Sequence, residues 1–277
     1  MDIENLRNWI GRDETESEVL TPALVRRFNA TFDRSSGTAP GDEAPLLIHL
    51  CLAQPIAPMS ALGRDGHPAL GGFLPPVPLP RRMWAGGAFD FRSAICIGET
   101  VTRRSVIRNV TLKRGRSGPL CFVTVDHEVT SDGRPALSER QDIVYRDAAP
   151  ATLPATEPEP EPAAGTHTRT LSPTPTLLFR YSALTFNGHR IHYDRTFCTE
   201  TEGYPGLVVH GPMQATLLCQ FAADLKGTRP SRFAFRSLSP LFDTDEFMLH
   251  AAATPRGLRL WTARPQGAVA MEAQAHW

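Results

Sequence analysis

The sequence lacks three features that would each indicate a particular class of protein. No run approaches 18 consecutive apolar residues, so we expect no membrane-spanning helix. Neither charge is in excess, because 29 Lys and Arg balance 29 Asp and Glu, which argues against a broad basic surface for nucleic acid or an acidic membrane. The first 19 residues are acidic and polar, where a secretory signal would be basic and then apolar.

Paired cysteines are also absent. The chain has five cysteines, an odd number, and none of them forms a CxxC pair. This usage is typical of free thiols in a reducing cytoplasm, and it disfavours a structural zinc site. The sequence therefore predicts a cytoplasmic protein without disulfides or metal, whose cysteines are Cys51, Cys96, Cys121, Cys198 and Cys219.

Proline, by contrast, is abundant, with 25 residues in a chain of 277. Many of them lie in residues 148–175, a stretch that contains EPEPEP and has leucine as its only large apolar residue. Such a segment prefers extended polyproline geometry, so we predict a linker between residues 1–147 and residues 176–277. The alternative is a long surface loop within one domain.

The two halves resemble each other. Each carries a Phe-Arg-Ser strand, at 91–93 and 235–237, followed by segments that alternate apolar and polar residues as half-buried antiparallel strands do. In the second half, an apolar stripe predicts a helix from Gly211 to Gly227. In the first half, four prolines in residues 75–82 forbid the corresponding helix. We predict an α+β fold in which two curled antiparallel sheets each wrap a central helix, the N-terminal helix being degraded.

The densest polar cluster lies in residues 181–194 and is followed by the Gly-rich stretch 203–213. A neutral His192 in an apolar pocket is a competent general base, and a helix beginning at Gly211 offers backbone N–H groups to a developing negative charge. These groups are sufficient for adding water to a double bond conjugated to a carbonyl. Alternatively, His192 and Asn187 are core polar groups. A metal site of His189, His192 and His210 is disfavoured, since no carboxylate pair completes the ligands.

The string YSALTFNGHRIHYD at 181–194, followed by GYPGLVVHGP at 203–212, resembles the hydratase motif of the MaoC-like, hot-dog-fold (R)-enoyl-thioester hydratases. The stretches 63–87, 112–129 and 140–146 are similar to the N-terminal domain of one subgroup. That subgroup contains itaconyl-CoA and mesaconyl-C4-CoA hydratases and fatty-acid-synthase-like 3-hydroxyacyl-thioester dehydratases. The resemblance covers nearly the whole chain apart from the linker, and it implies a double hot-dog.

The resemblance assigns roles to individual residues. The family's catalytic histidine falls on His192, and its oxyanion-hole glycine falls on Gly211. The family's catalytic Asp falls on Asn187, its Asn-Pro pair falls on 189–190, and a helix position that usually supplies Ser is Cys219. An Asn amide orients a water but cannot take its proton, so the usual two-residue relay is incomplete. If His192 alone moves the proton, the pH–rate profile has one acidic limb at roughly 6–7.

The N-terminal half has no histidine with a matching downstream helix, and His49 and His67 have no Asn or Asp partner at the family's spacing. We therefore expect this half to be non-catalytic and to form the pocket for the acyl part of the substrate. Two arginines lie in its Gly/Pro-rich loop, either as solvated surface groups or as partners of a substrate carboxylate. The predicted substrate-binding residues are Arg81, Arg82, His189, Arg190 and His210.

The sequence thus predicts a hydro-lyase that adds water reversibly to an α,β-unsaturated acyl-CoA, such as itaconyl- or mesaconyl-CoA giving citramalyl-CoA. No metal or cofactor is expected, because the thioester itself acidifies the α-position. The alternatives are a fatty-acid-type dehydratase, a hot-dog thioesterase and a non-catalytic acyl-CoA binding module. Acyl chain length stays open, and so does the oligomeric state, either a monomeric double hot-dog or a homodimer.

Overall fold

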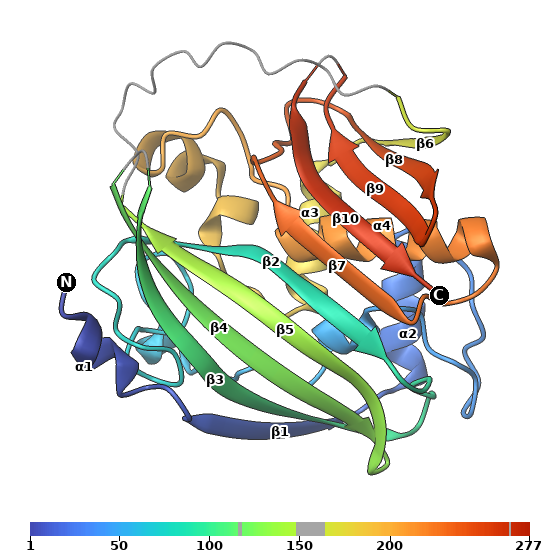
Figure 1. Ribbon diagram of the computed structural model, residues 1–277, viewed down its shortest axis with the longest axis horizontal. Helices are drawn as coiled ribbons and strands as arrows, with labels where there is room; N and C mark the ends of the chain where they lie inside the picture. Colours follow the sequence, from blue (N-terminus) through green and yellow to red (C-terminus); the bar gives the residue numbers. More distant parts are fainter. Residues whose placement is uncertain (116–117, 148–163, 266) are drawn as a thin grey trace.

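The computed structural model describes residues 1–115, 118–147, 164–265 and 267–277 (Figure 1). Its strands form one ten-stranded antiparallel sheet in the order β1-β3-β4-β5-β2-β7-β10-β9-β8-β6. The first half contributes β1 (Asp13–Val19), β2 (Arg81–Phe91), β3 (Thr100–Gly115), β4 (Gly118–Ser131) and β5 (Arg134–Arg146). The second contributes β6 (His167–Leu171), β7 (Arg232–Ser237), β8 (Phe247–Thr254), β9 (Gly257–Ala263) and β10 (Val269–His276).

The two predicted sheets are joined edge to edge by strands β2 and β7, in the middle of Figure 1. The pairing runs from Gly86 opposite Arg236 to Asp90 opposite Arg232, and this last pair also forms an ion pair. Phe89 of β2 stacks on Phe233 of β7, with ring centroids 6.4 Å apart. The repeat seen in the sequence therefore folds as two halves of one continuous sheet with a shared core.

The long helix predicted in the second half is confirmed. Helix α4 (Gly211–Lys226) ends at Gly227, which adopts the left-handed conformation with φ of 71° that favours glycine. It is buried from Met213 to Ala222 and packs on β8, β9 and β10. No helix in the described parts of the chain is long and apolar enough to cross a membrane.

In its described residues, the first half has no counterpart of α4. It has α1 (Ile3–Arg7) and α2 (Pro22–Thr31), and α2 packs on α3 (Pro175–Leu184) of the second half. The chain between α2 and β2, all of which the structure describes, contains only the 3₁₀ turns Ile48–Cys51 and Met59–Ala61. The long irregular segment 52–80 is consequently free to extend towards the second half.

Two expectations about loops are wrong. Residues 148–163 of the predicted linker lie outside the described residues, but 167–171 form strand β6 on β8, and α3 already begins at Pro175. The alternating His-Thr-Arg-Thr-Leu pattern of β6 was hidden by the prolines on both sides. Arg81 and Arg82, expected in a Gly/Pro loop, are the first residues of β2, opposite Arg146 and Tyr145 of β5.

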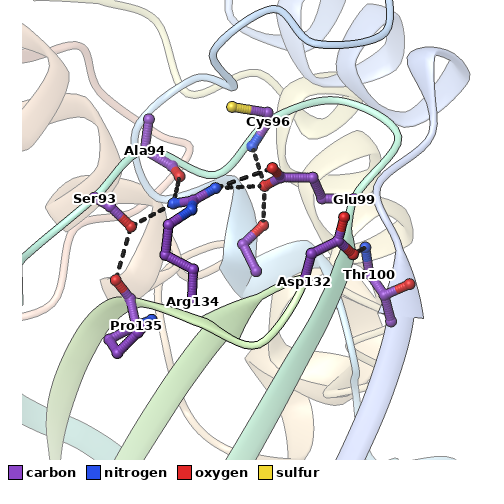
Figure 2. Close-up of polar contacts among 9 residues, drawn as sticks. Ser93, Ala94, Cys96, Glu99, Thr100, Asp132, Arg134 and Pro135 are labelled. Carbon is purple, nitrogen blue, oxygen red and sulfur yellow. Dashed lines mark hydrogen bonds and ion pairs between the residues drawn. The ribbon is translucent and has the colours of Figure 1, made fainter.

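A polar cluster fixes the connection between β2 and β3 to the turn between β4 and β5 (Figure 2). The Arg134 guanidinium donates to both carboxylate oxygens of Glu99 at 2.9 Å, and also to the carbonyl of Ala94 at 2.9 Å. The Asp132 carboxylate accepts from the backbone N–H of Thr100 at 2.8 Å. These groups satisfy one another at the end of the sheet and tie the β2–β3 connection to the β4–β5 turn.

We predict that Gly87→Ala weakens the packing of β2 against its two neighbours, β5 and β7. A Cβ at Gly87 would lie 2.5 Å from the backbone oxygen of Arg140 on β5 and 3.2 Å from the ring of Phe235 on β7, so β2 would have to shift away from both neighbouring strands. Overpacking of this kind lowers the free energy of unfolding by about 1–3 kcal/mol. Gly72→Ala is the control, because its nearest neighbour is 4.0 Å away. Equal urea midpoints for the two variants would contradict the prediction.

Candidate active site

A cavity of about 1480 Å³ lies between the two halves and is lined by both. Its wall includes His67 and Trp84 from the first half and Asn187, His192 and Gly211 from the second. The volume exceeds the roughly 300–1,000 Å³ typical of small-molecule pockets, so the cavity has room for a long substrate. The structure thus brings the three predicted catalytic residues to one wall and places the first half opposite them.

His192 ends the 3₁₀ turn Arg190–His192 and is 7% exposed. Its Nδ1 lies 2.7 Å from the carbonyl oxygen of Val208. A carbonyl can only accept, so Nδ1 carries the hydrogen and Nε2 keeps its lone pair. Burial lowers the pKa of His192 to about 4, although the hydrogen bond to Val208 opposes the shift. His192 is therefore a neutral ring with a free acceptor nitrogen at neutral pH.

His210, predicted to bind substrate, lies behind His192 rather than on the cavity wall. The two rings stack with centroids 3.6 Å apart, and His210 is fully buried. Its Nε2 forms a 2.8 Å hydrogen bond with the Ser182 hydroxyl. Burial also holds the pKa of His210 well below its ordinary value, so both stacked rings are uncharged. This geometry makes His210 a support for His192.

Asn187 lies in the turn after α3 and lines the cavity. Its backbone N–H donates to the carbonyl of Ser182 at 2.8 Å, and its side-chain oxygen accepts from the backbone N–H of His189 at 3.0 Å. The residue before it, Phe186, has a positive φ of 49°. The amide oxygen of Asn187 thus already helps to shape the loop that carries His189 and His192.

Gly211 is the first residue of α4 and faces the cavity. The first N–H groups of a helix have no partner within it, and the helix dipole makes this end electropositive. A Cβ at Gly211 would meet nothing outside the helix closer than 3.8 Å, so the protein itself does not require glycine here. Because Gly211 lines the cavity, a ligand oxygen can approach this end of the helix.

The first half contributes a polar pair where the sequence led us to expect no catalytic group. Nδ1 of His67 lies 2.7 Å from a carboxylate oxygen of Asp65, and the His67 ring lies 4.0 Å from that of His189 between centroids. His49 also has an acidic partner, Glu139, at 3.3 Å. The sequence DGH, with Asp two residues before His, contains a local signal for the first pair. Nothing in it indicates that the loop reaches His189, more than 120 residues later.

Two of the three predicted substrate-binding arginines have other partners. Arg81 donates to Glu202 at 2.9 Å and packs over Tyr204, while Arg190 binds Asp194 at 2.7 Å and packs over Phe197. Neither lines the cavity, whereas Arg82 does. The positive charge of Arg82 contributes to lowering the pKa of His189, behind the larger effect of burial. Arg82 is therefore the predicted arginine that faces the site.

Within the described residues, one group of side chains has atoms close enough to share a metal ion. Its members are Asp65, His67 and His189, with ligand atoms within 4.8 Å of one another. This differs from the histidine trio considered from the sequence. The hydrogen bond between Asp65 and His67 already satisfies two of the three groups. The absence of a metal stays a prediction.

We predict that His192 remains neutral far below the ordinary histidine range. Because its ring is buried and has no acidic partner among the described residues, protonation should have a midpoint near pH 4 rather than near 6.5. Nitrogen NMR of histidine-labelled protein measures this directly, with the signal assigned by its loss in His192→Gln. Exposed His167 provides the control signal. A His192 midpoint between 6 and 7 would contradict the burial argument.

Comparison with known proteins shows what the chain is related to. Residues 47–243 match the family described as hydroxyacyl-thioester dehydratase type 2. The chain is 46% identical to mesaconyl-C(4)-CoA hydratase of Chloroflexus aurantiacus over 268 residues, 96% of this chain and 95% of that protein.

Solved structures agree on the fold. A MaoC-like dehydratase aligns with a TM-score of 0.71 at 14% identity, covering 98% of this chain and 99% of that one. A Mycobacterium tuberculosis protein described as a double hotdog aligns with a TM-score of 0.59 at 14% identity, covering 96% and 95%. The predicted α+β hot-dog fold is confirmed. The chain belongs to the hydroxyacyl-thioester dehydratase type 2 family and is an acyl-CoA hydratase/dehydratase.

Proposed function

We propose that this hydratase acts on a C5 dicarboxylic enoyl-CoA, either mesaconyl-C4-CoA or itaconyl-CoA, and forms citramalyl-CoA. The relative from Chloroflexus aurantiacus, named for the first of these compounds, supports the choice. The observation that carries it is the position of Arg82 on the cavity wall, close enough to influence the pKa of His67 and His189. In a C4 thioester of mesaconate, the free carboxylate is attached to the carbon that takes the water. A cation is therefore needed next to the reacting atoms.

The residues divide the chemistry between them. The backbone N–H of Gly211 binds the thioester oxygen and stabilises the negative charge that develops there when water adds. His192 presents Nε2 to the attacking water, and Arg82 binds the free carboxylate. The amide of Asn187 shapes the loop beside them. The proposal needs no metal or bound cofactor, because the thioester already makes the α-carbon acidic.

The proposal also covers the oligomeric state of the enzyme and its location in the cell. All five cysteines are free, and four of them are buried, which fits a reducing cytoplasm. The pairing of β2 with β7 supplies within one chain the contact between two hot-dog units. A monomeric double hot-dog is thus sufficient for activity.

A panel of enoyl-CoAs tests the proposal. The panel contains mesaconyl-C4-CoA, itaconyl-CoA, crotonyl-CoA and a C10 enoyl-CoA, and each assay follows enoyl absorbance together with release of free thiol. We expect the highest kcat/KM with a C5 dicarboxylic substrate, without thiol release. Preference for the C10 substrate would indicate a fatty-acid-type enzyme. Thiol release would indicate a thioesterase, and tight binding without turnover would indicate a binding module.

We predict that Arg82→Gln changes the preference among substrates. Loss of the cation should lower kcat/KM for mesaconyl-C4-CoA by about 10²-fold, because one charge-assisted hydrogen bond to a carboxylate contributes about 1.5–3 kcal/mol. Crotonyl-CoA, which has no free carboxylate, is the matched control and should be affected less than threefold. Equal losses for the two substrates would show that Arg82 does not bind the carboxylate.

We predict that Gly211→Ala lowers kcat without weakening the fold. The added methyl group has room within the protein, with neighbours no closer than 3.8 Å, but it occupies the space next to the N–H that the thioester oxygen needs. A displaced oxyanion contact should cost about 10- to 100-fold in kcat, less than complete removal of such a donor. The urea midpoint should match that of the wild type. An unchanged kcat would remove Gly211 from the site.

A further inference from the structure

A water that adds to a double bond has two hydrogens, and each needs an acceptor in a closed site. Nε2 of His192 is one acceptor. The family motif supplies an Asp as the other, but this chain has Asn187 there, whose oxygen already accepts from His189. We propose that His67, held by Asp65, is the second acceptor and takes the proton of the attacking water. The inference rests on the proposed hydration and adds to it a catalytic residue from the first half.

The pair has the arrangement of a general base and its orienting carboxylate. Asp65 accepts from Nδ1 of His67 at 2.7 Å and from the backbone N–H of His67 at 3.1 Å. Because a carboxylate only accepts, Nδ1 carries the hydrogen and Nε2 of His67 keeps its lone pair. His67, His189 and His192 all line the cavity. Both acceptor nitrogens therefore belong to rings that bound the same cavity.

The loop that carries His67 is built to reach the second half. Gly66 has a φ of 87°, and a Cβ there would lie 2.0 Å from the carbonyl oxygen of Gly188. The backbone N–H of Arg190 donates to the carbonyl of Asp65 at 2.9 Å, and its guanidinium donates to the carbonyl of Arg64 at 3.2 Å. Two glycines and two hydrogen bonds thus dock this loop directly onto the loop that ends in His192.

The surrounding charges favour His67 over His192 as the ring that holds the proton. Burial lowers the pKa of His192 to about 4, and no anion of the described residues lies beside it to offset the cost of a charge. Burial also lowers the pKa of His67, but Asp65 acts against the shift. The other charged or titratable groups facing His67 are Arg82, which lowers its pKa, His189 and His192. Asp65 is ionised, since hydrogen bonds from His67 lower its pKa despite burial.

The step balances without any further reactant. The water oxygen forms a bond to the β-carbon while one O–H bond breaks and its proton goes to Nε2 of His67. The electron pair of the C=C bond moves to the α-carbon and is delocalised into the thioester oxygen. The proton then passes from His67 to the α-carbon, which restores the Asp65–His67 pair and completes the addition of one water. His192 holds the second water hydrogen throughout.

Two variants at His67 and one at Asp65 test the proposal, using the enoyl-CoA of the panel that the wild type hydrates fastest. His67→Asn keeps an amide donor for Asp65 but cannot take a proton, and His67→Ala removes both functions. Each should lower kcat by about 10²- to 10⁴-fold, the range for a positioned acid–base group, with KM changed less than threefold. His167→Asn, on exposed strand β6, is the control.

The pH profile separates proton transfer from a structural role. Activity should rise with pH as His67 loses its proton, with a midpoint below the ordinary histidine value because burial lowers the pKa of His67. Asp65→Asn removes the charge that raises the pKa of His67, so this midpoint should move to lower pH while kcat falls about tenfold. Residual activity of His192→Gln should keep the wild-type midpoint.

Near-normal kcat in His67→Asn would reduce the ring to a packing role, and an unshifted midpoint in Asp65→Asn would assign the titration to another group. Either result overturns the proposal. Melting temperatures identify variants that do not fold, and Asp65→Asn tests the role of His67 by itself if the His67 variants are lost. Wild-type turnover on the panel decides the proposed function, whereas ratios to wild type decide the role of His67, so the two failures are distinguishable.

Discussion

The pairing of β2 with β7 is the interaction on which the rest of the structure depends. It joins the halves through backbone hydrogen bonds between Gly86–Asp90 and Arg232–Arg236, and it brings Phe89 onto Phe233. Only with the two sheet edges joined can the irregular segment 52–80 of the first half lie over the polar loops of the second. The cavity wall is therefore a product of an interface between halves, and neither half contains it alone.

The site buries several histidine rings and has few acidic side chains that could stabilise their charged forms. His192, His210 and His189 all have lowered pKa values, first of all because burial penalises the charged ring. Stacked neutral imidazoles replace the apolar side chains that would otherwise fill this space. The cost of keeping polar rings away from water is reduced by specific hydrogen bonds, one from Nδ1 of His192 to the carbonyl of Val208 and one between Nε2 of His210 and the Ser182 hydroxyl. The result is an uncharged His192 whose Nε2 is free to accept a hydrogen bond at neutral pH.

Much of the fold and part of the site followed from local patterns in the sequence. The apolar stripe between Gly211 and Gly227 predicted α4 correctly, since helix period and terminal glycine are local signals. The motif around His192 placed this ring in a buried setting next to the helix start. The identity of Arg82 as the cavity-facing arginine could not be separated from Arg81, because alternation along β2 decides which of the two neighbours faces inward.

The missed features have a common physical origin in contacts across long chain separations. Asp65 and His67 matter because their loop meets 187–190, and a turn sequence contains no information about what it will touch. The partners of Arg81 and Arg190, Glu202 and Asp194, are likewise set by folding of loops. Strand β6 was hidden because a five-residue edge strand between prolines has too short a pattern to distinguish from a linker.

Covalent joining of two unequal hot-dog units also has a consequence for symmetry. Two identical chains related by a twofold axis must place the same residues on both sides of their interface, so any loop that enlarges one site also appears at the other. Here one half has α4, and the other has the irregular segment 52–80 in its place. The two units of this chain are therefore not equivalent. Two identical units would form two reaction centres, whereas this chain forms one. Because the first half needs no reaction centre of its own, its side of the cavity can be adapted to the substrate that reacts at the second half.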